Sequence, residues 1–411
     1  MSSEAAGKPR PERTQGQSAP PQQQQEHRQH GNMAGISRAF VFARKQALPA
    51  VRGWIAHTKL ALQEPQFFTW GQLHPNWSAD SDPEGAPLAF DVAAYQRHLR
   101  AQRFGQALCY QPTISSTQTI LRDATGNKPG GKSLDNEALG RDLGEAEAGT
   151  PVGEGLAVLA DVQLAGKGRG KNEWVSPKGC LSFSYLSHYS NGATLPFVQY
   201  LVSLAVVKAI KNKPGLGSLP LHIKWPNDIY VNRRDKIGGI LCNADYDGKM
   251  FTVIIGVGIN VNNSKPTTCL NDVIRAHAAD LGLGDAQPLT MTREELLANF
   301  FFEFEQIRNS FLVKGFAPFS TEYTDNWLHT DQEVLVERAA PKAAAPGGAN
   351  EEPLSETETP APRMEPARIT GIAPSGNLTV QFANSGGRDE EVIPDTTSLD
   401  MLRGLVTRKR G

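Results

Sequence analysis

Hydrophobic residues follow helical spacing in several parts of the chain after residue 90. One of these stretches is apolar nearly all round, which is typical of a buried helix. In another, Thr292 and Glu295 have the spacing of a capping box and Gly315 ends the apolar run, so both ends of that helix are marked. The pattern predicts helices over residues 91–104, 115–125, 195–212 and 292–315.

In other stretches, apolar residues alternate with polar ones or form short runs bounded by turn residues, which predicts β-strands. These predicted strands are residues 105–112, 155–165, 179–189, 221–231, 236–246 and 249–262. Helices interleaved with strands that short turns connect are typical of an α+β domain with a mixed sheet. We place this domain at residues 86–316.

After Trp327 the pattern predicts short strands only, at residues 332–339, 367–374, 376–384 and 389–396. They are interrupted at about residues 339–366 by a stretch rich in Pro, Ala and Glu, which we expect to be a disordered insert. The rest of residues 317–411 fits a small β-barrel domain, close to the lower size at which domains fold alone.

The N-terminal part, residues 1–85, has the composition of a low-complexity extension. Residues 1–35 are rich in Gln, Pro and charge and nearly free of large apolar residues, so we expect them to be disordered. Residues 36–59 contain basic residues and no acidic ones, which allows a short basic helix. No secretory signal pattern precedes them.

Overall charge narrows the choice of partners. The formal net charge is −1 and the isoelectric point is near 6.8, so we expect no nucleic acid and no membrane as partner. We expect a soluble protein, because no apolar run is long enough to span a bilayer. Four cysteines lie far apart without the spacing of a metal site, which indicates free thiols and a reducing, cytoplasmic location. They are Cys109, Cys180, Cys242 and Cys269.

One short segment, GNKPGGKS at residues 126–133, matches the phosphate-loop pattern with Lys132 as its lysine. That motif requires a buried strand before the first glycine and a helix after the serine. The preceding residues look like a short helix, and the following residues are polar and broken by glycines. We therefore interpret the segment as a surface loop, and a P-loop NTPase built on Lys132 stays as an alternative.

Two other stretches are better suited to bind an anion. In residues 165–180, Lys167, Arg169 and Lys171 alternate with glycines directly after a predicted strand, so the loop can approach a phosphate closely. A solvated basic turn is the alternative for this stretch. In residues 223–242, Lys224 stands within apolar sequence, where a lysine requires a partner, either an anionic substrate or an acid such as Asp228.

Five segments occur together and in order: SSTQ (115–118), GKGRGKNEW (166–174), KWPND (224–228), KIGGIL (236–241) and GVGIN (256–260). In this combination the chain resembles the biotin–protein ligases, and most closely their eukaryotic and fungal branch, the holocarboxylase synthetases. The resemblance covers about residues 88–411. It implies a catalytic domain of the biotin/lipoate ligase type followed by a small SH3-like β-barrel.

The resemblance also implies a reaction in two steps. ATP and biotin give biotinyl-5′-AMP and pyrophosphate, with Mg²⁺ expected. A lysine in the biotin-acceptor domain of a biotin-dependent carboxylase, such as acetyl-CoA or pyruvate carboxylase, then takes the biotinyl group. Bacterial bifunctional members carry a DNA-binding helix-turn-helix at the N-terminus, and residues 1–85 show no such pattern.

Roles for individual residues follow from the resemblance as well. Arg169 and Lys224 are implied as the catalytic cations, because carboxylate attack on an α-phosphate brings two anions together. The implied biotin-binding residues are Ser116, Thr117, Gln118, Gln163, Gly166, Lys167, Gly168, Arg169, Lys224, Gly238 and Gly239. The implied nucleotide-binding residues are Lys167, Arg169, Trp174, Lys224 and Asn260, and no metal ligands are assigned.

The nearest alternative is a lipoate–protein ligase or octanoyltransferase of the same fold. The hydroxyls and amides of Ser116, Thr117, Gln118 and Gln163 favour a ureido ligand, which both donates and accepts hydrogen bonds. An alkyl chain would leave these groups unpaired. A non-catalytic scaffold that uses the Pro-rich insert as a ligand for partner domains would leave the basic loop unexplained.

Overall fold

The computed structural model describes residues 39–43, 51–52, 66–69, 90–125, 153–282, 289–338, 363–383, 386–393, 397–400 and 405–408. The segment GNKPGGKS, the predicted disorder of residues 1–35 and most of the predicted insert lie outside these residues. The insert was predicted to run to residue 366, but the last part of it is ordered, because strand β13 begins at Arg363.

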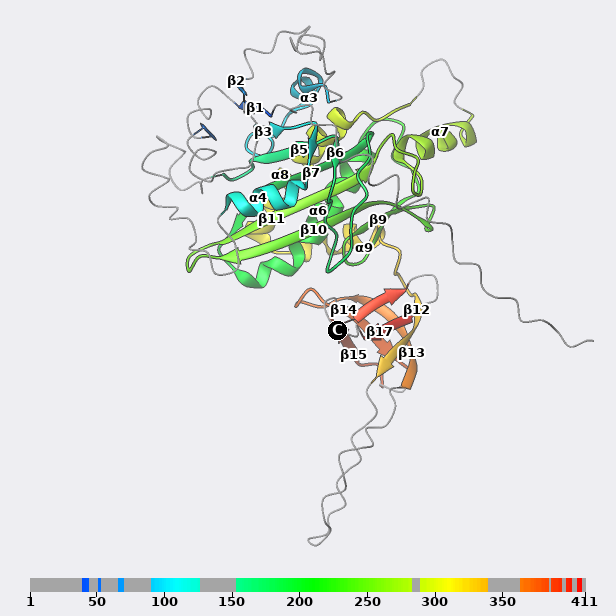
Figure 1. Ribbon diagram of the computed structural model, residues 1–411. Coiled ribbons are helices and arrows are strands. Elements are labelled where there is room, and N and C mark those ends of the chain that lie inside the picture. Colours follow the sequence, from blue (N-terminus) through cyan, green and yellow to red (C-terminus); the bar gives the residue numbers. More distant parts are fainter. Residues whose placement is uncertain are drawn as a thin grey trace, which may run out of the picture. The chain divides into compact units, whose positions relative to one another are not determined.

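A nine-stranded mixed sheet forms the larger part of the fold (Figure 1). Its order is β2-β1-β3-β5-β7-β11-β10-β9-β8. The β1–β2 and β3–β5 pairs are parallel and the other pairs are antiparallel, which confirms the predicted mixed sheet. The strands are β1 Phe40–Ala43, β2 Gln66–Thr69, β3 Ala107–Tyr110, β5 Ala157–Ala160, β7 Cys180–Tyr189, β8 Leu221–Lys224, β9 Asp228–Val231, β10 Asp235–Tyr246 and β11 Phe251–Asn260. Two short strands, β4 Thr113–Ile114 and β6 Val162–Gln163, pair with each other.

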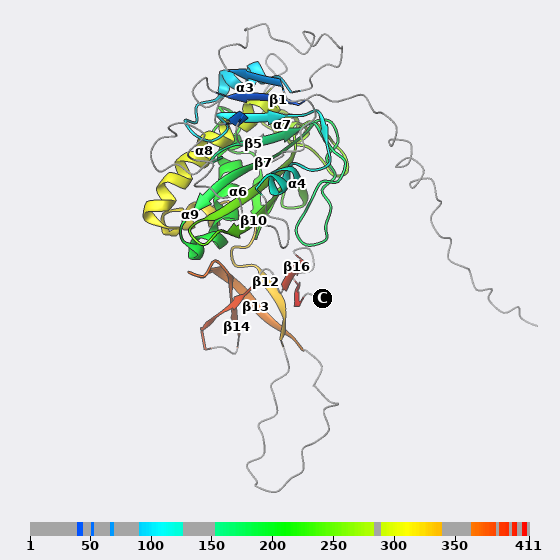
Figure 2. The same ribbon diagram turned by 60° about the vertical axis from the view of Figure 1, so that its left-hand side comes forward.

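Helices cover both faces of this sheet (Figures 1 and 2). Helices α6 (Leu195–Lys211) and α8 (Arg293–Lys314) pack together on one face, and α3 (Val92–His98) packs against α8. Helix α4 (Thr117–Ala124) covers part of the other face, against β5, β7 and β11. Helix α7 (Leu270–Asp280) was not predicted from the sequence.

Successive residues of β11 pack on opposite faces of the large sheet. Val253, Ile255 and Val257 belong to the large core with α6 and α8, whereas Ile254 packs with the α4 side. Successive strand residues point to opposite faces, so Gly256 and Gly258 lie on the α4 face of the sheet. This arrangement leaves room beside α4 for a pocket.

Four predicted elements need correction. Residues 40–43, predicted to lie in a disordered extension with a possible basic helix, form strand β1, which is buried and pairs with β3. The first helix ends at His98 rather than residue 104. The predicted strand 221–231 is a hairpin of β8 and β9, because KWPND turns the chain. Helix α9 (Ala317–Asp325), which the predicted boundary placed in the C-terminal domain, packs against α6.

Within the described residues, one helical stretch, Gly192–Lys211, is long and apolar enough to cross a membrane by length and composition. It consists of a 3-10 turn, η4 (Gly192–Thr194), and α6. Twelve of the 17 residues of α6 are buried, and the helix packs against α8, β8 and β10. Its apolar character is therefore explained by its place in the core.

The C-terminal strands form a second sheet, of six strands in the order β15-β14-β13-β12-β17-β16. Among the described residues the sheet is open, with β15 and β16 at its edges, so the predicted closed barrel stays a prediction. The strands are β12 Glu333–Arg338, β13 Arg363–Ile372, β14 Leu378–Phe382, β15 Asp389–Val392, β16 Thr397–Asp400 and β17 Leu405–Arg408. The last two were not predicted.

Candidate active site

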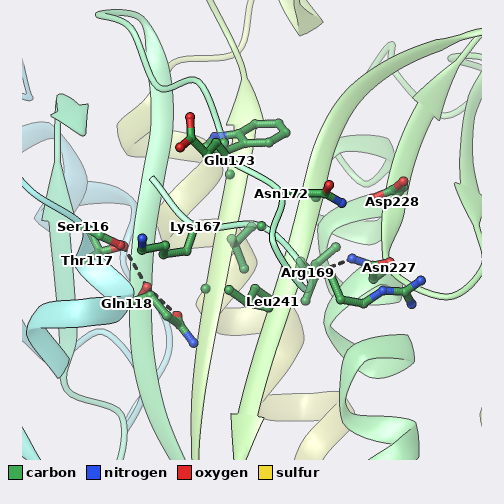
Figure 3. Close-up of a pocket in the computed structure, with 18 of the residues that line it drawn as sticks. Ser116, Thr117, Gln118, Lys167, Arg169, Asn172, Glu173, Asn227, Asp228 and Leu241 are labelled. Atoms are coloured by element: carbon green, nitrogen blue, oxygen red, sulfur yellow. Dashed lines mark hydrogen bonds between the residues drawn. The ribbon is translucent and has the colours of Figure 1, made fainter. Parts of the chain in front are cut away.

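A pocket of about 250 Å³ lies on the α4 face of the large sheet (Figure 3). It is enclosed by the start of α4, the basic loop after β6, the turn between β8 and β9, and the glycine-containing parts of β10 and β11. Its lining residues are Ser116, Thr117, Gln118, Gln163, Lys167, Gly168, Arg169, Asn172, Glu173, Trp174, Phe183, Ser184, Lys224, Trp225, Pro226, Asn227, Asp228, Lys236, Gly239, Ile240, Leu241, Gly256, Val257 and Gly258.

The floor of the pocket depends on the two glycines of β11. Gly258 is opposite Gly239 and Gly256 is opposite Leu241 in the β10–β11 ladder. A Cβ on Gly256 would lie 2.6 Å from Gln118 Oε1, and one on Gly258 would lie 2.4 Å from Trp174 Nε1. Gly256 and Gly258 therefore make room for Gln118 and for the Trp174 indole.

Gly258→Ala is accordingly expected to displace Trp174 and to weaken nucleotide binding about tenfold, because a methyl group and the indole cannot share the space. The matched control is Gly217→Ala, since Gly217 has an ordinary backbone conformation and its nearest neighbour, Lys211 O, lies 3.9 Å from the added Cβ. Calorimetric titration with ATP measures both. Equal affinities for the two variants would contradict a nucleotide position against Trp174.

One end of the pocket is a neutral hydrogen-bonded network. Gln163 Oε1 accepts from the Thr117 backbone N–H (2.9 Å) and hydroxyl (3.2 Å). Ser184 Oγ lies 2.8 Å from Thr117 Oγ1 and donates to Gln118 Oε1 at 3.0 Å. Gln118 Nε2 donates to Asn243 Oδ1 and to the Ile254 carbonyl. These hydrogen bonds fix the positions of the side chains.

Ser116 differs from its neighbours in this network. The residue is 1% exposed, and its hydroxyl has no hydrogen-bond partner within the described part of the chain. An unpaired hydroxyl costs free energy on burial unless a partner is supplied. Because Ser116 lines the pocket, a ligand can supply that partner.

The basic loop crosses the pocket as a narrow turn. Trp174 N donates to the Gly166 carbonyl at 3.0 Å, and Gly168 N donates to the Asn172 carbonyl at 2.9 Å. A Cβ on Gly166 would lie 2.3 Å from the Trp174 carbonyl oxygen, so only glycine allows this approach. The loop places Lys167 and Arg169 over the cavity (Figure 3). In the part of the chain described here, neither cation has an ion-pair partner.

At the other end lies the turn between β8 and β9. Asn227 is fixed by reciprocal bonds with Ile240, since its Nδ2 donates to the Ile240 carbonyl and its own carbonyl accepts from Ile240 N, both at 2.8 Å. Asp228 Oδ1 lies 2.7 Å from Lys236 Nζ, so the ion pair considered for Asp228 and Lys224 forms with Lys236 instead. Lys224 Nζ lies 5.8 Å from the centre of the Tyr230 ring.

Most of the predicted site residues come together in this pocket. Those that line it are Ser116, Thr117, Gln118, Gln163, Lys167, Gly168, Arg169, Trp174, Lys224 and Gly239. Three others do not line it. Gly166 shapes the basic loop, and a Cβ on Gly238 would meet the Gly258 carbonyl and Ile229 rather than the cavity.

Asn260 is the third predicted site residue that does not line the pocket. Its Nδ2 donates to Thr267 Oγ1 and to the Thr268 carbonyl, and its Oδ1 accepts from Asn263 Nδ2. In this conformation the side chain orders the segment after β11. A contact between Asn260 and a nucleotide therefore stays a prediction.

The prediction from sequence also missed several lining residues. Asn172, Glu173, Asn227 and Asp228 lie within the quoted motifs, so the motif boundaries carried a signal for them. Lys236 looked like the polar start of a strand, and its position in the pocket depends on the pairing of β10 with β9 and β11. Ser184 lies on a strand face whose exposure to the pocket only the fold reveals.

Comparison with known proteins agrees with the geometry. Residues 148–260 match the model of the biotin/lipoate A/B protein ligase family. The chain is 34% identical to biotin–protein ligase 1, chloroplastic, of Arabidopsis thaliana, over 78% of this chain and 74% of that protein. It is 34% identical to biotin–protein ligase 2 of the same plant, over 78% and 83% of the two chains. The human biotin–protein ligase is 37% identical, over 78% of this chain and 38% of the longer human protein. The two plant relatives, matched over 74% and 83% of their length, together with the five ordered segments and the pocket that they build, show that the chain belongs to the biotin–protein ligase family.

Proposed function

We propose that this chain joins biotin to ATP in the pocket, forming biotinyl-5′-AMP and releasing pyrophosphate, and then transfers the biotinyl group to a lysine of an acceptor protein. The carboxylate oxygen of biotin forms a bond to the α-phosphorus as the bond to pyrophosphate breaks. The lysine amine then forms an amide as AMP leaves. The observation that carries this proposal is one pocket that combines the hydroxyl and amide groups at the start of α4 with the cations and the indole of the basic loop.

The neutral end is suited to the ureido ring of biotin. Ser116 offers a buried hydroxyl that can both donate and accept, and the backbone and side-chain bonds of Thr117 and Gln163 hold the adjoining wall. A lipoyl or octanoyl chain would leave the Ser116 hydroxyl without a partner, which disfavours the related acyl-transfer reaction.

The cationic end is suited to the reacting anions. Lys167 and Arg169 approach from the loop, and Lys224 and Lys236 approach from the sheet. Fixed positive charges stabilise the charge that gathers on the α-phosphate, and they cost no rearrangement at the moment of reaction. Arg169 offers forked donors to two oxygens, whereas Lys224 is a compact charge between the two reactants. Trp174 provides a flat wall for adenine.

We also propose that Mg²⁺ enters with the phosphates of ATP. Among the described residues no group of three or more His, Cys, Asp or Glu side chains could hold a metal ion. Mg²⁺ in nucleotide sites is commonly bound through one or two carboxylates and the substrate phosphates. Two carboxylates line the pocket and could contribute, Glu173 and Asp228.

The acceptors that we propose are the biotin-acceptor domains of biotin-dependent carboxylases, for example acetyl-CoA or pyruvate carboxylase. We propose further that the C-terminal strands belong to a closed SH3-like barrel and that the enzyme acts in the cytoplasm, without nucleic acid or membrane as partner. The near-zero net charge and the unpaired cysteines support this location.

ATP–pyrophosphate exchange by the purified protein tests the proposal. The assay is run with biotin, lipoate, octanoate or no acid. Exchange that requires biotin is the expected result, and exchange with lipoate or octanoate alone would assign the protein to the related acyl-transfer reaction. In a second arm, mass spectrometry of an isolated biotin-acceptor domain, incubated with enzyme, ATP and biotin, detects the mass added to its lysine.

A further inference from the structure

His329 lies outside the five ordered segments that carry the family resemblance, yet it contacts one of them, KWPND. It is fully buried, and its Nε2 accepts the backbone N–H of Trp225 at 3.0 Å. Trp225 lies between Lys224 and Pro226 in the β8–β9 turn and lines the pocket. One imidazole thus fixes the main chain next to a proposed catalytic lysine from about a hundred residues away.

The segment that carries His329 is itself tied to the edge of the sheet. Ile223 N donates to the Asn326 carbonyl at 2.8 Å, and Leu328 N donates to the Ile223 carbonyl at 2.9 Å. These bonds extend β8 by a short parallel pairing between Ile223 and Trp327. His329 lies two residues after Trp327, and this pairing therefore places it beside Trp225.

The imidazole of His329 is held in the tautomer whose Nε2 can accept the hydrogen bond from the Trp225 N–H. Its Nδ1 lies 2.8 Å from Gln332 Oε1, a partner that accepts, so the proton is on Nδ1 and the Nε2 lone pair faces Trp225. The pKa of His329 is lowered to about 4, mainly by burial and also by the charges of Lys224 and Arg233, against an opposite effect of the Gln332 hydrogen bond. The ring is therefore neutral at pH 7.

Trp225 is fixed at its other end as well. Its indole Nε1 donates to Tyr200 Oη on α6 at 2.8 Å, so the side chain is tied to the core helix and the main chain to His329. With both held, the turn has little freedom to shift Lys224, Asn227 or Asp228 relative to the cavity. A displacement of about 1 Å at such groups can lower a rate about 10²-fold.

We propose that His329 is a positioning residue for biotin adenylation, which holds the Lys224–Asp228 turn in register with the pocket by accepting the Trp225 N–H. The proposal rests on the proposed function for its effect on rate, and on geometry alone for its effect on the turn. His329 itself does not line the pocket. It acts through Trp225.

Two substitutions test the roles of the two ring nitrogens of His329 separately. His329→Gln places an acceptor near the position of Nε2 and can keep the bond to Trp225 N. His329→Asn keeps a polar group near Nδ1 and loses that bond. The control is His188→Asn, because His188 is also a buried imidazole, bonded through Nδ1 to Glu154, and it does not line the pocket.

Hydrogen exchange of the Trp225 amide in the full-length protein measures directly whether the hydrogen bond from Trp225 N–H to residue 329 is formed. We expect exchange to be about tenfold faster in His329→Asn than in His329→Gln, and unchanged in His188→Asn. Unchanged protection in His329→Asn, or equal loss in both His329 variants, would overturn the proposal. This outcome does not depend on the reaction that the enzyme performs.

Steady-state pyrophosphate exchange reads the effect on catalysis. We expect kcat to fall about tenfold in His329→Asn and to stay within about twofold in His329→Gln, with the KM for biotin nearly constant in both. A merely structural role would lower the melting temperature and the amount of active enzyme for both variants alike. If the wild-type protein shows no exchange with biotin, the proposed function fails, while amide protection still decides the role of His329.

Discussion

Arg169→Ala is expected to lower the kcat of biotin-dependent ATP–pyrophosphate exchange by about 10²–10³-fold, the usual cost of removing one fixed group that stabilises transition-state charge. Arg169 lies on the loop that covers the pocket, and in the described residues its guanidinium forms no ion pair that would hold it elsewhere. Its charge is therefore available to the phosphate and to the reactive intermediate. Arg169→Lys is expected to recover only part of the rate, because an ammonium cannot bind two oxygens through a planar fork.

Lys132→Ala is the control for Arg169→Ala. Lys132 is the lysine of the phosphate-loop pattern, and we expect exchange by this variant to match the wild type. Loss of nucleotide binding in Lys132→Ala, together with full activity in Arg169→Ala, would contradict the ligase site and restore the P-loop alternative. The two substitutions remove the same charge from two glycine-rich segments, so the comparison separates a functional loop from an accidental match.

Lys224→Met is expected to lower kcat by about 10²-fold, with a smaller change in the KM for ATP. Methionine keeps much of the aliphatic length and removes only the charge, so packing in the β8–β9 turn should persist. Lys249→Met, in the exposed turn between β10 and β11, is the matched control and should leave the rate unchanged. Pre-steady-state measurement of pyrophosphate release separates the chemical step from product release.

Lys236→Met decides between the two lysines of the sheet. Lys236 also lines the pocket, where it is paired with Asp228 and lies 5.7 Å from the centre of the Trp174 ring. We expect its loss to affect ATP binding more than the chemical step, because it lies on the side of the proposed adenine wall. A large fall in kcat for Lys236→Met with none for Lys224→Met would move the catalytic role to Lys236.

The basic loop and the phosphate-loop pattern illustrate how context decides between similar segments. Both combine glycines with lysine, and both could in principle surround a phosphate. Residues 166–174 follow a strand, β6, that ends at the pocket, and there Gly166 permits a close approach to the Trp174 carbonyl. The residues before the phosphate-loop pattern form helix α4 instead of a strand. The secondary structure that precedes a glycine-rich loop is thus a better guide to its function than the sequence of the loop itself.

Much of the fold could be predicted from the chain alone. The long apolar run of α6, the capping of α8 by Thr292, whose hydroxyl accepts from Glu295 N, and the alternation of β7, β10 and β11 are local properties. Local propensities and side-chain periodicity act within a few residues, so they can be read without knowing the partners. The order of the five family segments likewise indicated most of the pocket.

The tertiary structure alone decided the contacts between distant segments. Phe40–Ala43 becomes a strand because it finds an edge at β3. Asp228 pairs with Lys236, rather than Lys224, because the β9–β10 pairing brings that lysine to it.

The roles of two further residues were hidden for the same reason. Gly258 is required because the indole of Trp174, 84 positions earlier, lies upon it, and His329 reaches Trp225 across the edge of the sheet. In each case the stabilising interaction, close packing or a hydrogen bond between buried groups, is made with a residue that is distant in the sequence and that the fold brings near. No local pattern encodes which partner that will be.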